Sequence, residues 1–210
     1  MSALSEARGR TPRRSPRRRT VDTARSEELL TQAADIVLAE GFTTITMDQL
    51  AQRLGCSKAT LYSVAGTKEQ LVQTITRRFF ITAAEQIERA VAEEADSRRR
   101  IRTYLTGVGT AMRLHSPAFY DDMVNYEPTA RIYRKNSDAA ARRVHEMIDD
   151  GIRAGALRDV NGTFAAQVVA LTIDAVQSGA LLRSTGLSAG DAFSELGDLV
   201  LDGLSRPAGS

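Results

Sequence analysis

The sequence has a single cysteine, Cys56, and no tryptophan among its 210 residues. One cysteine excludes a disulfide within the chain and a zinc site built from cysteine thiolates. The only histidines, His115 and His145, lack the spacing of a metal cluster, so we expect no metal and no other cofactor. Aromatic residues make up only 5% of the chain, which disfavours a surface for stacking single-stranded nucleic acid.

Proline and long apolar runs are also scarce. Between residues 20 and 205 the only prolines are Pro117 and Pro128, and so few chain breakers favour helices. No stretch reaches the roughly 18 apolar residues of a membrane span. The N-terminal arginines are not followed by the apolar segment typical of a secretory leader. We therefore expect a cytoplasmic protein without a membrane partner.

Charge is spread unevenly along the chain. Residues 1–25 contain eight arginines and two acidic residues, a net charge of +6, whereas the remainder carries 20 basic and 24 acidic groups. Residues 1–22 have little apolar area to bury, so we expect a disordered arginine-rich arm whose partner is a polyanion. Such an arm inserts into a DNA minor groove or only raises nonspecific affinity, and the sequence leaves both roles open.

Apolar spacing and helix-capping residues predict nine helices, and no segment alternates like a strand for long. The second and fourth helices begin with the capping-box patterns of residues 46–49 and 67–70. The eighth helix is apolar on more than one face and is expected to dimerise together with the last helix. The expected segments are about 23–40, 47–54, 57–64, 67–95, 97–115, 117–125, 128–154, 163–184 and 188–204.

Residues 46–64 have the pattern of a helix-turn-helix motif. Ala51 is small where two helices cross, Gly55 permits the left-handed backbone of a tight turn, and Leu61 anchors the second helix. In such a motif the second helix enters the major groove, with its N-terminal residues facing base edges. Residues four positions apart share a face of this helix; these pairs are Lys58 with Tyr62 and Ala59 with Ser63.

Residues 25–80 resemble the DNA-binding domain of TetR-type bacterial transcriptional regulators, through the string at 41–62 and its continuation at 67–71. The resemblance implies a homodimer on a palindromic operator in double-stranded DNA, usually as a repressor that a small molecule releases. It implies base contacts for Lys58, Ala59 and Ser63 and phosphate contacts for Thr46, Thr60, Tyr62 and Lys68, whereas Ser57 caps the reading helix. The candidate DNA-binding residues are Thr46, Ser57, Lys58, Ala59, Thr60, Tyr62, Ser63 and Lys68.

The chain departs from the family pattern at Ala65, where an aromatic residue is common, so we expect the reading helix to be held less firmly against the fourth helix. The C-terminal region contains no catalytic set, and we expect no enzyme activity. Its fifth to seventh helices combine apolar side chains with isolated polar groups, which predicts a cavity for a hydrophobic effector. The candidate lining residues are Tyr104, Val108, Met112, Phe119, Met123, Tyr126, Tyr133 and Met147.

The preferred interpretation is an all-α, ligand-responsive transcriptional regulator. Residues 23–70 form its three-helix DNA-binding domain, residues 71–205 a larger helical domain for ligand binding and dimerisation, and residues 206–210 a tail. The alternative is an architectural or low-specificity DNA-binding protein dominated by its arginine-rich arm. A small helical enzyme or carrier is a third class, which the helix-turn-helix pattern disfavours. Strong preference for one palindrome over random DNA distinguishes the first two.

Overall fold

The computed structural model describes residues 16–158 and 160–204, and every regular element in these ranges is an α-helix. The predicted all-α fold is confirmed, with ten helices in these ranges rather than nine. They are α1 (Pro16–Glu40), α2 (Met47–Arg53), α3 (Lys58–Ala65), α4 (Lys68–Glu93), α5 (Ser97–Met112), α6 (Pro117–Asn125), α7 (Glu127–Arg153), α8 (Gly162–Gln177), α9 (Ala180–Thr185) and α10 (Ala189–Leu204).

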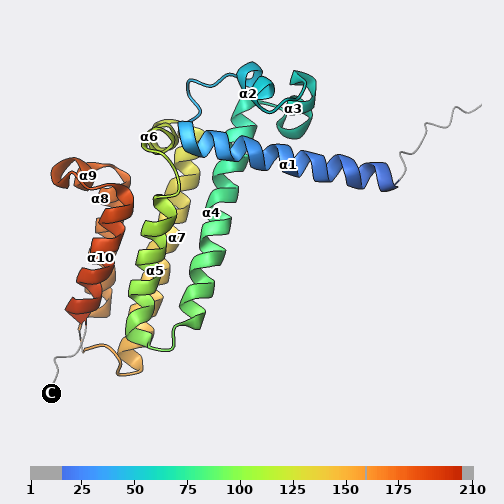
Figure 1. Cartoon of the computed structure of the whole chain (residues 1–210). Helices are drawn as coiled ribbons and strands as arrows, with labels where there is room; N and C mark the ends of the chain where they lie inside the picture. Colours follow the sequence, from blue (N-terminus) through green and yellow to red (C-terminus); the bar gives the residue numbers. More distant parts are fainter. Residues whose placement is uncertain (1–15, 159, 205–210) are drawn as a thin grey trace, which may run out of the picture.

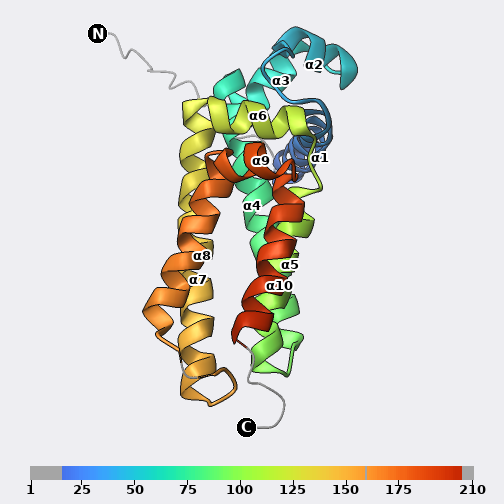
Figure 2. The same cartoon turned by 90° about the vertical axis from the view of Figure 1, so that its left-hand side faces the viewer.

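The helices form a small N-terminal group and a long bundle (Figure 1). Helices α1, α2 and α3 lie at one end, and α4 runs from them along the bundle beside α5 and α7. Helix α6 crosses the same end of the bundle, next to α1. Helix α8 packs on α7 and α10 packs on α5, and α9 spans their ends (Figure 2). The N-terminal group therefore meets the bundle through α4 and α6.

Side-chain caps begin the short helices, as the sequence predicts. The Thr46 hydroxyl accepts a hydrogen bond from the Gln49 N–H at 3.2 Å, and the Gln49 amide oxygen accepts one from the Thr46 N–H at 2.9 Å. This capping box satisfies two backbone donors that the first turn of α2 leaves free. Ser57 and Thr67 cap α3 and α4 through their hydroxyls, so three consecutive helices begin where their capping residues stand.

The start of α1 corrects the expected arm. The helix begins at Pro16, so the prediction of disorder is wrong for residues 16–22. Proline suits the first turn, where its missing N–H has no helical partner. Residues 16–22 extend a helix that already exists, so they avoid the unfavourable nucleation step. The expectation of disorder considered only how little apolar area these residues can bury. Residues 1–15, the rest of the predicted arm, and the tail at 206–210 lie outside the described residues.

The apolar segment at 163–184 is two helices, not one. Gly179 adopts a left-handed backbone with φ of +69°, and its N–H donates to the Val176 carbonyl at 3.0 Å, which ends α8. The apolar pattern continues through Leu181 and Leu182, which pack against the core from α9. Apolar spacing alone therefore does not reveal the break, whereas the glycine permits it.

Glycines allow α5 and α10 to pack closely. A Cβ atom on Gly109 would lie 2.5 Å from the Gly190 carbonyl oxygen, and one on Gly190 would lie 2.7 Å from the Gly109 carbonyl oxygen. A Cβ atom on a third glycine, Gly197, would lie 3.2 Å from the Cβ atom of Leu105. One side of α10 is thus occupied within its own chain, which leaves the opposite side for any partner.

We expect Gly109→Ala to lower the free energy of unfolding by about 1–3 kcal/mol, because the added methyl group meets rigid backbone. Gly203→Ala is the matched control, since a Cβ there has nothing within 4 Å. Urea denaturation of both variants measures the difference. Equal stability of the two would show that α5 and α10 are not packed this closely.

Candidate nucleic-acid interface and effector cavity

A tight turn sets the angle between α2 and α3. Gly55 has φ of +60°, the left-handed conformation that the sequence predicts for it. The Cys56 N–H donates to the Ala51 carbonyl at 3.0 Å, which closes the turn. Ala51 and Leu61 are both buried, at 4% and 0% exposure. These contacts hold α3 against the other two helices and leave one of its faces in solvent.

That face carries most of the candidate DNA-binding residues. Tyr62 is 39% exposed although it is large and partly apolar. Thr60 is half-buried, and its hydroxyl lies 2.7 Å from that of Ser57, so it is less available for a phosphate than its neighbours. The exposed candidates are Thr46, Ser57, Lys58, Ala59, Tyr62 and Ser63.

Lys58 forms an ion pair within the chain. Its ammonium lies 2.6 Å from a carboxylate oxygen of Asp48 at the start of α2. The hydrogen bond that Lys58 donates to the Asp48 carboxylate, together with the negative charge of that carboxylate, raises the pKa of Lys58 above the usual value. Asp48 was not among the candidates, although its position after Thr46 in the capping box places it near the reading helix. A DNA group that binds Lys58 must therefore compete with Asp48.

Lys68 stands at the first turn of α4, as predicted, but its ammonium donates to the Thr43 carbonyl at 3.2 Å. It therefore binds the loop between α1 and α2. Ala65, the departure from the family pattern, is half-buried and packs against the core.

Four of the eight candidate effector residues line one cavity of about 70 Å³. Phe79 and Phe80 of α4, which the sequence analysis did not include, also line it, together with residues of α8 and α10. None of its lining residues is charged. The candidates present are Tyr104, Val108, Met112 and Tyr133.

The other four candidates lie elsewhere. Phe119 and Met123 of α6 are completely buried and do not line the cavity. Met147 faces a separate hollow beside Glu88 and Arg143. The Tyr126 hydroxyl donates to Glu69 of α4 at 3.2 Å, so Tyr126 lies where the N-terminal domain meets the bundle.

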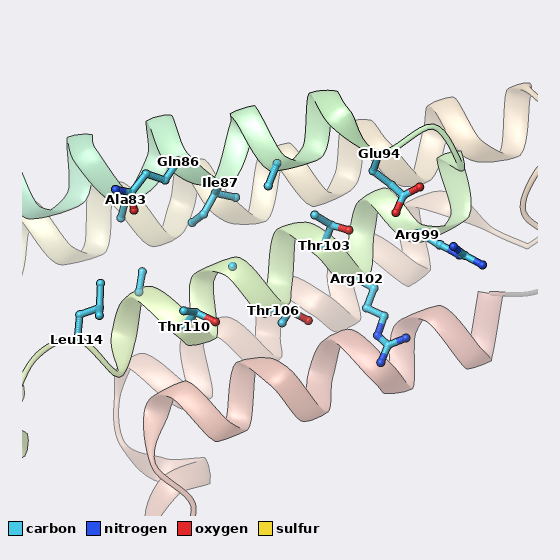
Figure 3. A pocket seen from close by; sticks show the side chains of 13 residues that line it. Ala83, Gln86, Ile87, Glu94, Arg99, Arg102, Thr103, Thr106, Thr110 and Leu114 are labelled. Atoms are coloured by element: carbon cyan, nitrogen blue, oxygen red, sulfur yellow. The ribbon is translucent and has the colours of Figure 1, made fainter.

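Two larger hollows are open grooves on the surface. One, of about 560 Å³, runs between α4 and α5, with alanines and Ile87 beside the threonines of α5 (Figure 3). Arg99, Arg102 and Glu94 stand at one end of it. The second, of about 520 Å³, lies between α8 and α10 and is mostly apolar.

Asp122 of α6 binds the N-terminal domain directly. Its carboxylate accepts hydrogen bonds from the Phe42 N–H at 2.5 Å, the Thr43 N–H at 2.7 Å and the Thr43 hydroxyl at 2.5 Å. Burial opposes its ionisation, but these hydrogen bonds outweigh burial and lower the pKa of Asp122. The sequence analysis missed Asp122, because nothing in the local pattern of α6 relates it to residues some 80 positions away.

A row of aromatic rings follows the same route from the cavity. Phe80 stacks on Tyr133 in the cavity wall, with 5.9 Å between ring centroids, and contacts Phe79 at 5.1 Å. Phe79 contacts Phe119 of α6 at 6.4 Å, and Phe119 contacts Phe42 of the N-terminal domain at 6.1 Å. Packed rings thus connect the cavity to the loop that Asp122 holds.

Within the described ranges, no group of three or more histidine, cysteine or acidic residues is arranged to hold a metal ion. No helix in the same part of the chain is long and apolar enough to cross a membrane.

Comparison with known proteins agrees with this geometry. Residues 29–75 match the family model of bacterial regulatory proteins, tetR family. The transcriptional activator FasR of Mycolicibacterium smegmatis is 24% identical over 159 residues, which are 73% of this chain and 71% of that protein. The uncharacterized regulator YdeS of Bacillus subtilis is 25% identical over 150 residues, or 69% and 73% of the two chains.

Solved structures share the fold at low identity. A TetR regulator from Haloarcula marismortui has a TM-score of 0.68 at 15% identity, covering 88% of this chain and 100% of its own. FadR from Bacillus subtilis has a TM-score of 0.60 at 14% identity, with 85% and 98% covered.

The helix-turn-helix geometry and the match to the family model identify residues 29–75 as a DNA-binding domain of the kind found in TetR-type transcriptional regulators.

We expect Lys58→Ala to weaken binding to the preferred duplex by about 1–3 kcal/mol, because α3 loses a donor to a base edge. Asp48→Asn should have the opposite effect and tighten binding to every duplex, since it removes a negative charge beside the DNA and releases Lys58. Lys135→Ala, an exposed lysine on α7, is the control for loss of charge. Fluorescence anisotropy on selected and random duplexes measures all three; an unchanged Lys58→Ala affinity would contradict the placement of α3.

We also expect Asp122→Ala to speed amide hydrogen exchange at Phe42 and Thr43 about tenfold or more, because both N–H groups lose their acceptor. Asp121→Ala, one residue earlier and exposed, is the matched control. Exchange measured by NMR reports the change. If both variants exchange alike, the α6 contact does not hold this loop.

Proposed function

We propose that this chain is a ligand-responsive repressor that binds a palindromic operator as a homodimer. In this proposal each α3 reads one major groove, with Lys58, Ala59 and Ser63 toward the bases. Thr46, Thr60, Tyr62 and Lys68 position the domain on phosphates. A small hydrophobic effector enters the cavity between α4, α5 and α7 and releases the dimer from DNA.

The observation that carries the ligand response is the connection between cavity and N-terminal domain. Tyr133 and Phe80 line the cavity, and Phe79, Phe119 and Phe42 continue the ring contacts into the loop after α1. Closely packed rings do not yield smoothly, so displacement of one is passed to the next. A ligand shifts DNA affinity only when it binds the two arrangements differently.

The size of the cavity supports such a displacement. Ligand pockets usually measure about 300–1,000 Å³, whereas this cavity measures about 70 Å³. An effector of ordinary size must therefore widen it. The walls include Phe79 and Phe80, so widening moves the aromatic row that reaches α6.

Proteins of the same fold hold small molecules. FadR from Bacillus subtilis was solved with stearoyl-CoA. A regulator from Saccharomonospora viridis, with a TM-score of 0.68 at 17% identity over 88% of this chain and 99% of its own, was solved with choline. These ligands belong to those proteins. They support a ligand-binding role for the bundle of this chain, and its uncharged lining favours a hydrophobic effector.

Exposed apolar side chains support dimerisation through α8 and α10. Phe164, Val168 and Leu171 recur on one face of α8 at 69%, 44% and 58% exposure, and Leu199 of α10 is 70% exposed. Contiguous apolar surface of this kind marks an interface. A two-fold axis through it would assemble a four-helix seam.

Selection of duplexes from a random pool, followed by a reporter assay, tests the proposed function. We expect one palindromic sequence to be enriched, with half-sites whose centres lie about one DNA turn, ~34–36 Å, apart. A reporter behind this sequence should become more active when the regulator is absent. Uniform binding to all duplexes with a steep salt dependence would contradict the operator model; reduced reporter activity would contradict repression.

We expect Leu171→Arg to raise the dimer dissociation constant about 100-fold or more, because the interface would enclose an unpaired charge. Ile81→Arg is the matched control: Ile81 on α4 is 59% exposed, nearly the same as Leu171 at 58%, but lies outside α8 and α10. Sedimentation velocity over a concentration series measures both variants. A monomeric wild-type chain at micromolar concentration would refute the seam.

A further inference from the structure

Three buried polar atoms in the described part of the bundle have no hydrogen-bond partner. They are His115 Nε2, the Tyr133 hydroxyl and Gln177 Nε2. Buried polar groups are nearly always hydrogen-bonded, so each such atom requires an explanation. Tyr133 is only 4% exposed. Its hydroxyl lies near those of Tyr120 and Ser137 but makes no well-aligned hydrogen bond with either.

Two of these residues, His115 and Tyr133, contact a single side chain, Tyr120 of α6. The His115 ring stacks on the Tyr120 ring, with 6.1 Å between centroids, and the Tyr133 ring meets it edge-on at 6.0 Å. The Tyr120 hydroxyl donates to the carbonyl of Val176, the residue before Gln177, at 3.1 Å. Residues from α6, α7, α8 and the loop before α6 therefore converge at this point.

This cluster adjoins the effector cavity. Tyr133 lines the cavity, and His115 packs against Phe79 in its wall with 5.4 Å between ring centroids. Polar groups without partners thus lie in the cavity wall, at Tyr133, and directly behind it, at His115, and a few such groups orient ligands in mostly apolar sites.

The hydrogen-bonding capacity of the cluster is defined. His115 Nδ1 lies 3.2 Å from the Ser116 carbonyl and acts as its donor, which leaves Nε2 as an acceptor. Burial lowers the pKa of His115, so the ring is neutral near pH 7. Burial also raises the pKa of Tyr133 well above its usual value, so its hydroxyl keeps the proton. His115 and Tyr133 therefore offer one ring acceptor, one hydroxyl donor and no charge.

We propose that His115 and Tyr133 bind the buried end of the effector, and that this end is an uncharged group such as a primary amide or a hydroxyl. The inference rests on the proposed function, since it takes the cavity as the effector site. An amide donates to His115 Nε2 and accepts from the Tyr133 hydroxyl. A carboxylate has no donor for His115, and an ammonium or amidinium has no acceptor for the Tyr133 proton. Neither charged group finds a counter-charge in the cavity wall.

Benzamide, benzoate and benzamidinium test this inference, because they have nearly the same shape and differ in the charge of one end. Binding is followed at pH 7.5 by NMR of the histidine ring nitrogens, with His145 as an internal control on the same protein. We expect benzamide to shift the His115 Nε2 signal and to bind at least tenfold more tightly than either ion. Equal binding of the three, or no shift at His115, overturns the inference.

Two hydroxyl deletions separate recognition from packing. Tyr133→Phe keeps the ring and removes the unpartnered hydroxyl, so benzamide affinity should fall about tenfold. Tyr62→Phe is the control for loss of a tyrosine hydroxyl, since Tyr62 lies on α3 and outside the cavity. An unchanged affinity in Tyr133→Phe overturns the inference. The chemical shift of His115 Nε2 also reports whether this nitrogen is hydrogen-bonded before benzamide is added. If it is, and benzamide does not change the shift, water occupies the site and the inference is overturned.

Release of the selected operator duplex is measured separately and distinguishes the two proposals. Benzamide that binds at His115 without weakening DNA binding contradicts the proposed ligand response and leaves the site intact. A compound that releases the operator without changing the His115 signal contradicts the site and leaves the ligand response intact.

Discussion

Three hydrogen bonds to one carboxylate hold the DNA-binding domain against the rest of the molecule. Asp122 accepts them from Phe42 and Thr43, and Lys68 binds the carbonyl of the same Thr43. The loop between α1 and α2 is therefore held by α6 and by the first turn of α4. Since α2 and α3 follow this loop directly, the direction in which α3 faces depends on it. The orientation of α3 and the packing of the bundle therefore depend on the same contacts.

Opposite charges lie close together where α3 meets the start of α2. The Asp48 carboxylate lies 2.6 Å from the Lys58 ammonium, which the proposed function assigns to DNA contact. A phosphate would give Lys58 the same kind of partner that it already has in Asp48, a negatively charged oxygen. A base edge would also present a specific arrangement of hydrogen-bonding groups and a specific shape. A negative charge at this position lowers affinity for all DNA, and so favours discrimination over tightness.

The parts of the molecule that local chemistry determines were predictable. Thr46, Ser57 and Gly55 act through neighbours within a few residues, so the helix-turn-helix motif and its exposed face were correctly expected. Contacts between distant segments were not: Asp122 has no sequence signature, and the cavity depends on how α4 turns Phe79 and Phe80 inward. The helix break at Gly179 was not predicted because the apolar pattern continues across it. Glycine is also found both where helices pack closely and where the backbone is left-handed, so its presence alone did not indicate a break.

The close contact between α5 and α10 has a consequence for assembly. Helix α10 packs closely on α5 because glycines lie at their contact, and α8 packs on α7. The apolar groove runs between these two pairs of helices. The cavity wall includes side chains from α5, α7, α8 and α10. In the proposed function, an effector that widens this cavity would therefore shift α8 and α10, the two helices proposed to form the dimer interface. Ligand binding and dimerisation are thermodynamically linked. A ligand that changes the dimer dissociation constant therefore binds with an apparent affinity that depends on the protein concentration.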